Sequence, residues 1–147
     1  MSNRPIDILL VEDNPGDVRL LKESFREARV DTVIHHVADG AEALAYLRRQ
    51  GRHAHATRPD IVLLDLNLPG RDGRTVLRDI KGDDALKAIP VVVLTSSSAQ
   101  EDVDHSYADH ANCFITKPAE FDRFLDVVQR IESFWFKTVA LPQENPA

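Results

Sequence analysis

Polar side chains with related chemistry follow four separate apolar runs of this chain. These side chains are carboxylates, hydroxyls and one amine: Glu12-Asp13, Asp65, Thr95-Ser96 and Lys117. Hard divalent cations such as Mg²⁺ prefer oxygen ligands, and Mg²⁺ needs only a few carboxylates. A lysine ammonium supplies a compact positive charge for an anion. A threonine hydroxyl and the exposed N–H groups at a helix start can hold the oxygens of a phosphoryl group. Together these residue types indicate a site where an aspartate attacks phosphorus as a nucleophile.

Asp65 stands where a buried strand is predicted to end. Residues 61–64 form a continuous apolar run, and Pro69-Gly70 supplies a turn soon after it. Such a run is typical of a strand buried on both faces of a parallel sheet. An aspartate at this position could simply organise the turn. The matching residues at three other strand ends favour a functional role, because ligands of open α/β sheets bind at the carboxyl ends of the strands.

Strands and helices alternate five times along the chain. The strands are predicted at residues 6–11, 33–37, 61–64, 89–94 and 112–116. The helices are predicted at residues 15–29, after Asp39-Gly40, at 74–81, at 99–109 and from 121 through 136. Asn14-Pro15 is a helix start, with Asn14 as N-cap and Pro15 at the first helical position. This order predicts a doubly wound α/β fold with a five-stranded parallel sheet and five helices.

Composition narrows the class of protein. The 147 residues are enough for one domain with a real core, expected at residues 1–136 with a disordered tail at 137–147. The formal charge of −6 argues against binding nucleic acid or an anionic membrane. No apolar run is long enough to span a bilayer. The single cysteine, Cys113, fits a reducing compartment, so a cytoplasmic location is expected.

The four strand ends resemble the receiver domain of two-component response regulators, a flavodoxin-like fold, over residues 5 to about 132. The matching features are the acid pair, the Leu-Leu-Asp-Leu-x-Leu-Pro-Gly context of Asp65, the hydroxyl residue after the fourth strand and Lys117-Pro118. The resemblance implies that Asp65 accepts a phosphoryl group from a sensor histidine kinase. It implies a Mg²⁺ site at Glu12, Asp13, Asp65 and the backbone carbonyl of Asn67.

The same resemblance assigns further roles. Lys117 would pair with the phosphoryl group and Thr95 would move to bond it. Ser96, next to Thr95, is counted with them as a catalytic candidate. The Lys117–Pro118 peptide bond would be cis. Phe114 occupies the family's aromatic switch position, where a plain core role is the alternative. Because Phe114 lacks a hydroxyl, any readout there would depend on rotamer and packing.

Three less specific sequence segments resemble a single-domain subgroup related to cyanobacterial phytochrome response regulators. They are residues 12–21, residues 92–98 and Phe134-Trp135. By analogy, the partner would be a phytochrome-type photoreceptor kinase. A homodimer through the last helix and Phe134-Trp135-Phe136 is also expected, because three consecutive aromatics on a helix cannot all face one core. The alternative is that Trp135 folds back over the domain.

Two other functions are consistent with parts of this pattern. A phosphohydrolase of the haloacid-dehalogenase type also uses an aspartate nucleophile and Mg²⁺. That class needs a second aspartate two residues later as general acid, and Asn67 stands there instead. A flavin- or nucleotide-binding module would need a Gly-rich phosphate loop after the first strand, where this chain has Glu12-Asp13. The sequence therefore favours a phosphoacceptor module with at most weak autophosphatase activity over a turnover enzyme.

Overall fold

Five short strands, most of them rich in apolar residues, form a parallel sheet at the centre of the protein. A computed structural model describes residues 5–28, 31–68, 72–96, 99–118, 120–138 and 140–142, without the side chains of residues 121 and 136–138. The strands are β1 (Ile6–Val11), β2 (Thr32–Val37), β3 (Ile61–Leu64), β4 (Val91–Thr95) and β5 (Cys113–Thr116). Their order is β2-β1-β3-β4-β5, and every neighbouring pair is parallel. The predicted sheet is confirmed.

Alternation along the strands divides the core in two, because successive side chains of a strand point to opposite faces. One face carries Leu9, Val11, Val62, Leu64, Val91 and Val93. The other face carries Ile8, Leu10, Ile61, Leu63, Val92 and Leu94. Each of these side chains is at most 2% exposed. Since both faces are buried, the strands need helices on both sides.

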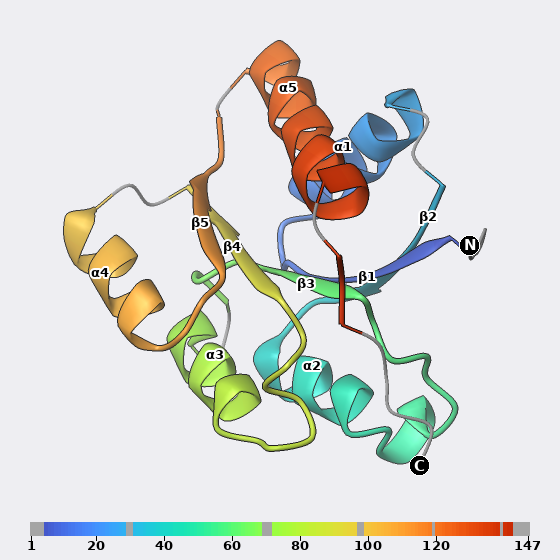
Figure 1. Ribbon diagram of the computed structural model, residues 1–147, viewed down its shortest axis with the longest axis vertical. Coiled ribbons are helices and arrows are strands. Elements are labelled where there is room, and N and C mark those ends of the chain that lie inside the picture. The colour runs from blue at the N-terminus through green and yellow to red at the C-terminus, as the bar shows by residue number, and fades with distance from the viewer. Residues whose placement is uncertain are drawn as a thin grey trace.

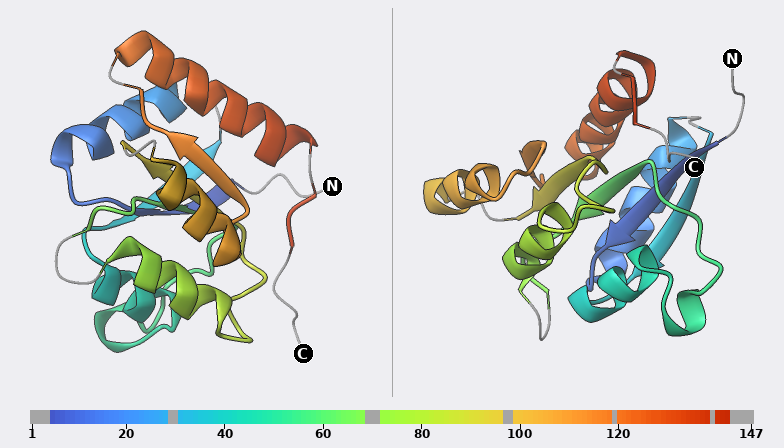
Figure 2. Two further views of the ribbon diagram at one scale, coloured as in Figure 1. Left: turned by 90° about the vertical axis from the view of Figure 1, so that its left-hand side faces the viewer. Right: turned by 60° about the horizontal axis from the view of Figure 1, so that its bottom comes forward.

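Helices cover both faces of the sheet (Figures 1 and 2). They are α1 (Pro15–Glu27), α2 (Gly40–Leu47), α3 (Gly73–Lys81), α4 (Gln100–Ala108) and α5 (Phe121–Ile131). Helices α1 and α5 pack against the face of Ile8 and Leu10, whereas α2 and α3 pack against the face of Leu9 and Val11. Helix α4 lies beside β5 and α3. The predicted five helices are therefore present.

Capping side chains stand at the start of three of the five helices: Asn14 at α1, Asp39 at α2 and Asp72 at α3. The Asn14 side chain accepts hydrogen bonds from the backbone N–H groups of Gly16 and Asp17, as expected for an N-cap. The Asp72 side chain caps α3 in the same way. At the start of α4 the N-cap residue is Ala99, which makes no side-chain capping bond, although a serine run at residues 96–98 stands directly before it. Residues 97–98 of that run lie outside the described residues.

The last helix continues past α5 with a changed hydrogen-bond pattern. A π-helical segment, Glu132–Thr138, follows Ile131 directly. Its i→i+5 bonds add about one residue to each turn. This segment ends at Thr138, two residues beyond the helix end predicted at residue 136. Residues 143–147 of the predicted tail lie outside the described residues, so the disorder of that tail stays a prediction.

Candidate phosphoacceptor site

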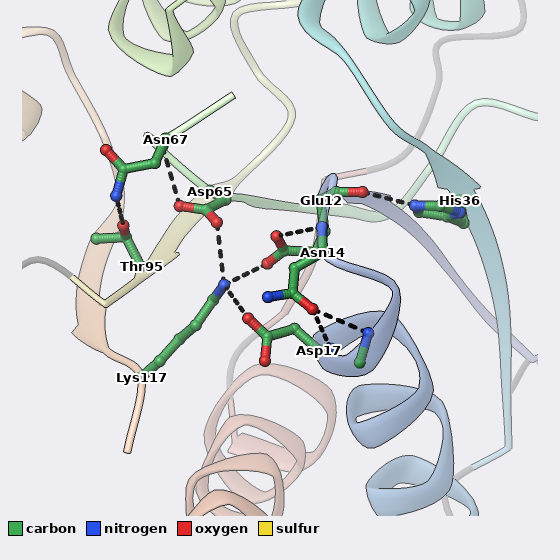
Figure 3. Close-up of polar contacts among 9 residues, drawn as sticks. Glu12, Asn14, Asp17, His36, Asp65, Asn67, Thr95 and Lys117 are labelled. Carbon is green, nitrogen blue, oxygen red and sulfur yellow. Dashed lines mark hydrogen bonds and ion pairs between the residues drawn. The ribbon is translucent and has the colours of Figure 1, made fainter. Parts of the chain in front are cut away.

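The acid pair follows β1 directly, and strand β2 fixes its backbone. The Glu12 N–H donates to the Val37 carbonyl at 3.1 Å. The Glu12 carbonyl accepts from the Nε2 atom of His36 at 2.7 Å (Figure 3). Glu12 is 1% exposed, whereas Asp13 is exposed to solvent. One carboxylate of the pair is therefore held inside the protein, and the other faces solvent.

Asp65 lies at the end of β3, next to the end of β1. Its N–H donates to the Val11 carbonyl at 3.0 Å, and its Oδ1 accepts from the Asn67 N–H at 3.0 Å. Gly73, the first residue of α3, packs against the backbone of this turn. A Cβ atom at position 73 would lie 2.5 Å from the Asp65 carbonyl oxygen and 2.5 Å from the Leu66 Cα. The missing side chain of Gly73 thus lets α3 approach the residue that carries the candidate nucleophile.

Lys117 brings β5 into the site. Its N–H donates to the Thr95 carbonyl at 2.7 Å, which holds the ends of β4 and β5 together. Its Nζ atom donates to Asp65 Oδ2 at 3.0 Å, to Asp17 Oδ2 at 2.8 Å and to Glu12 Oε1 (Figure 3). The Lys117 side chain is only 6% exposed. One buried ammonium therefore joins the residues that directly follow β1 and β3 to a residue of α1.

The expected cis bond at Lys117–Pro118 is not found. The described residues contain no cis peptide bond, so this bond is trans. The trans form is favoured for most X–Pro bonds, although by only about 0.5–1 kcal/mol.

Burial and hydrogen bonding set the ionisation of the cluster. Burial raises the pKa of Glu12 to about 7, against the opposing effect of Lys117. Burial also acts to raise the pKa of Asp65, but hydrogen bonds from the Asn67 N–H, Lys117, Glu12 and Thr95 hold it below its ordinary value. Burial acts to lower the pKa of Lys117, and its three carboxylate partners more than reverse that effect. Asp65 is therefore a carboxylate and Lys117 an ammonium at neutral pH.

The hydroxyl and aromatic residues lie close by. Thr95 is fully buried, and its Oγ1 accepts from the Asn67 Nδ2 at 3.4 Å (Figure 3). Ser96 is exposed next to it. Phe114 is half-buried and packs against the core on the α2–α3 side. The Phe114 N–H donates to the hydroxyl of Tyr107 on α4 at 3.2 Å. The switch roles of Thr95 and Phe114 stay predictions.

Three carboxylates are close enough to share a metal ion. Among the described residues, ligand atoms of Glu12, Asp13 and Asp65 all lie within 4.8 Å of one another. An all-oxygen set of this kind suits a hard divalent cation that keeps part of its water shell. The acidic cluster therefore fits a divalent metal site, and its members are those predicted from the sequence. The Asn67 carbonyl as a further ligand stays a prediction.

Asp17 was missed by reasoning from the sequence. It lies in the first turn of α1 and bonds Lys117 at a shorter distance than Asp65 does. The helix start at Asn14-Pro15 was visible in the sequence, and it places position 17 one turn into a helix that begins at the site. The sequence alone did not show that this turn faces β5.

The geometry and the sequence pattern agree on the class of protein. The sequence pattern of the family described as "Response regulator receiver domain" matches residues 8–129. The chain belongs to the response regulator receiver domain family. Receiver domains are phosphoacceptors, and membership implies interaction with a histidine kinase.

Individual relatives match nearly the whole chain. Response regulator Rcp1 of Synechocystis sp. is 48% identical over 141 residues, which cover 96% of this chain and 96% of Rcp1. The crystal structure of the phosphorylated cyanobacterial phytochrome response regulator RcpA superposes with a TM-score of 0.91 at 50% identity, covering 95% and 99% of the two chains. The Mn²⁺-bound form of Rcp1 superposes with a TM-score of 0.89 at 47% identity, covering 95% and 100%. The predicted family and subgroup resemblance are confirmed.

Proposed function

We propose that this response regulator accepts a phosphoryl group on Asp65 and controls partner binding through the resulting change in conformation. The observation that carries the proposal is the contact of Lys117 Nζ with Asp65 Oδ2 at 3.0 Å, beside the acidic cluster. An Asp65 oxygen attacks phosphorus in line, and a new oxygen–phosphorus bond forms. The phosphorus–nitrogen bond of a kinase phosphohistidine breaks, and its electron pair goes to the leaving imidazole.

Each neighbour of Asp65 has a part in this transfer. Lys117 supplies positive charge to the phosphoryl oxygens, and Thr95 and Ser96 supply hydroxyl donors. Glu12, Asp13, Asp65 and the Asn67 carbonyl are the proposed ligands of Mg²⁺. A bound Mg²⁺ would offset the negative charge that collects around the transferred group.

A turnover enzyme of the haloacid-dehalogenase type has no support from the site or the relatives. Asn67 takes the position of the general acid in that class. Its backbone N–H bonds Asp65, its side chain lies against Thr95, and an amide is a poor proton donor. We therefore infer that the protein is not an enzyme beyond weak autophosphatase activity.

The proposed partner is a sensor histidine kinase of the phytochrome type. The support is the high identity to RcpA, described as a cyanobacterial phytochrome response regulator. A cytoplasmic location fits such a partner. None of the described helices combines the length and the apolar character that a bilayer span needs. The net charge of −6 supports a protein partner rather than nucleic acid or an anionic membrane surface.

A homodimer through the last helix is also part of the proposal. Phe134 is 52% exposed, and its ring meets that of Trp135 edge-on at 5.5 Å. Trp135 itself packs against the core on the α1–α5 side, as the alternative interpretation of the sequence expected. The side chain of Phe136 lies outside the described part of the structure. Of the three aromatics predicted to form the dimer contact, Phe134 is therefore the one on which the proposed contact centres.

Phosphoacceptor chemistry is tested by intact mass and peptide mapping after incubation with Mg²⁺ and acetyl phosphate. The wild-type chain should gain one phosphate at Asp65, and Asp65→Asn should gain none. An Asp65→Asn protein that gains the same phosphate would refute the assignment.

The dimer is tested by light scattering with and without acetyl phosphate. Phe134→Ser should shift a dimeric wild-type chain to monomer. Val33→Ser is the matched control, because Val33 is a 39% exposed apolar residue on the edge strand β2. A wild-type chain that stays monomeric in both conditions would end this part of the proposal.

A further inference from the structure

Asp17 differs from the other two carboxylates that bond Lys117. Within the described chain, the acidic cluster that fits a divalent cation contains Glu12, Asp13 and Asp65 but not Asp17. Asp17 nevertheless bonds the Lys117 ammonium at 2.8 Å. Its carboxylate is therefore a partner of the lysine without being a member of the metal-ligand group.

The other two partners of Lys117 have two tasks. Glu12 and Asp65 bond the ammonium, and both belong to the acidic cluster. A divalent cation and the ammonium would thus draw on the same two side chains, and the two positive charges repel each other. An ammonium whose partners were only these two would compete with the metal ion for them.

Asp17 is well placed to relieve this competition. It sits in the first turn of α1, where a carboxylate is stabilised by the helix dipole. Its own N–H donates to the Asn14 side chain at 3.2 Å, which fixes that turn. In Figure 3 it approaches the ammonium from the side opposite Asp65. Its side chain is 29% exposed, against 2% for Glu12, so it holds the ammonium from the rim of the site.

We propose that Asp17 is a positioning residue: it keeps the Lys117 ammonium in the site while a divalent cation binds Glu12 and Asp65. The inference rests on the proposed function, because it assigns Lys117 to the phosphoryl group. Without Asp17, the ammonium turns fully to Glu12 and Asp65. Metal binding then has to displace it, and the lysine loses the fixed partner that aims it at the phosphoryl group.

A double-mutant cycle separates this role from a structural one, because two residues that act through one contact show a coupling. Mg²⁺ affinity is measured by calorimetry on the full chain, at about 0.5 M salt to screen the loss of distant charge. In a chain that keeps Lys117, Asp17→Ala should lower Mg²⁺ affinity about threefold or more. In the Lys117→Met chain the same substitution should change it by less than about twofold. The rate of phosphorylation by acetyl phosphate should show the same coupling.

Two matched variants control for misfolding and for the loss of a negative charge on α1. Asp17→Asn keeps the shape of the side chain without its charge, and it serves if Asp17→Ala does not fold. Glu23→Gln removes a carboxylate from the same helix, one that pairs with Arg26 at 2.6 Å on the surface. It should leave Mg²⁺ affinity unchanged.

Equal effects of Asp17→Ala in both backgrounds, or no effect in either, would overturn the inference. A wild-type chain that binds no Mg²⁺ would also overturn it. If the wild-type chain binds Mg²⁺ with the predicted coupling but Asp65 gains no phosphate, only the proposed function fails.

Discussion

Replacing Gly73 with alanine should damage stability and phosphorylation together. The added Cβ would lie 2.5 Å from the Leu66 Cα and 2.5 Å from the Asp65 carbonyl oxygen. Carbon atoms pack best at about 3.5–4.0 Å, so α3 and the turn after β3 would have to separate by about 1 Å. The Leu66 carbonyl oxygen would also lie only 2.8 Å away. All three atoms belong to the backbone, so a change of side-chain rotamer cannot relieve the contact.

The expected cost follows from this overlap. Overpacking of this kind costs about 1–3 kcal/mol. The higher helix propensity of alanine offsets at most about 1 kcal/mol, and less at the first position of a helix. A net loss of about 1–2 kcal/mol would lower the Tm of a domain of this size by about 2–8 °C. Because a shift of about 1 Å in a reacting group can cost about a hundredfold in rate, phosphorylation of Asp65 should slow by about 10- to 100-fold.

Urea unfolding and the rate of phosphate gain from acetyl phosphate measure the two effects. Gly82→Ala is the matched control at the other end of α3. Its φ of −88° suits alanine, and the nearest atom to its Cβ would be the Arg78 carbonyl oxygen at 3.0 Å. This variant should stay within about 1 kcal/mol of wild type and phosphorylate normally. If Gly73→Ala matched wild type in both measurements, the close approach of α3 to Asp65 would not be what holds the nucleophile in place.

Three further sets of substitutions test residues 12–14, which connect β1 to α1. Glu12→Gln combined with Asp13→Asn should abolish Mg²⁺ binding in calorimetry, and unchanged affinity would remove the pair from the metal site. Burial raises the pKa of Glu12 from 4.5 to about 7, so the folded state holds this proton more tightly than the unfolded state does. The stability that this proton contributes is full below about pH 4.5 and is lost by about pH 7. In urea unfolding without metal, Glu12→Gln should gain up to about 3 kcal/mol on wild type across that range, and a constant difference would contradict the shift. Asn14→Ala should cost about 1 kcal/mol of unfolding free energy and Asn14→Gly only a few tenths, and equal costs would show that the capping bond does not matter.

The fold could be predicted because its signals are local. The run at residues 61–64 is apolar at every position and becomes a strand buried on both faces. Asn14 and Pro15 mark a helix start that the structure confirms. The convergence of Asp65 and Lys117 also followed, since parallel strands bring their carboxyl ends to one edge of the sheet.

The features that could not be predicted depend on contacts between distant segments. Asp17 and Lys117 are 100 residues apart, and they meet because the first turn of α1 lies beside the residue that follows β5. The fit of Gly73 against Asp65 is a close contact between the start of α3 and the residues that follow β3. No residue pattern indicated the π-helical segment Glu132–Thr138, in which Trp135 packs against its own domain.

The hydrogen bond between Tyr107 and Phe114 also protects the sheet. Among the described strands, β5 pairs with β4 alone, so its outer edge presents backbone groups that another extended chain could join. The Tyr107 hydroxyl already accepts from one of these groups, the Phe114 N–H, and α4 lies along the same edge. Ser106 is the one buried residue of α4, so few apolar contacts hold this helix in place. Any signal that moved α4 away from β5 would therefore expose a strand edge open to aggregation.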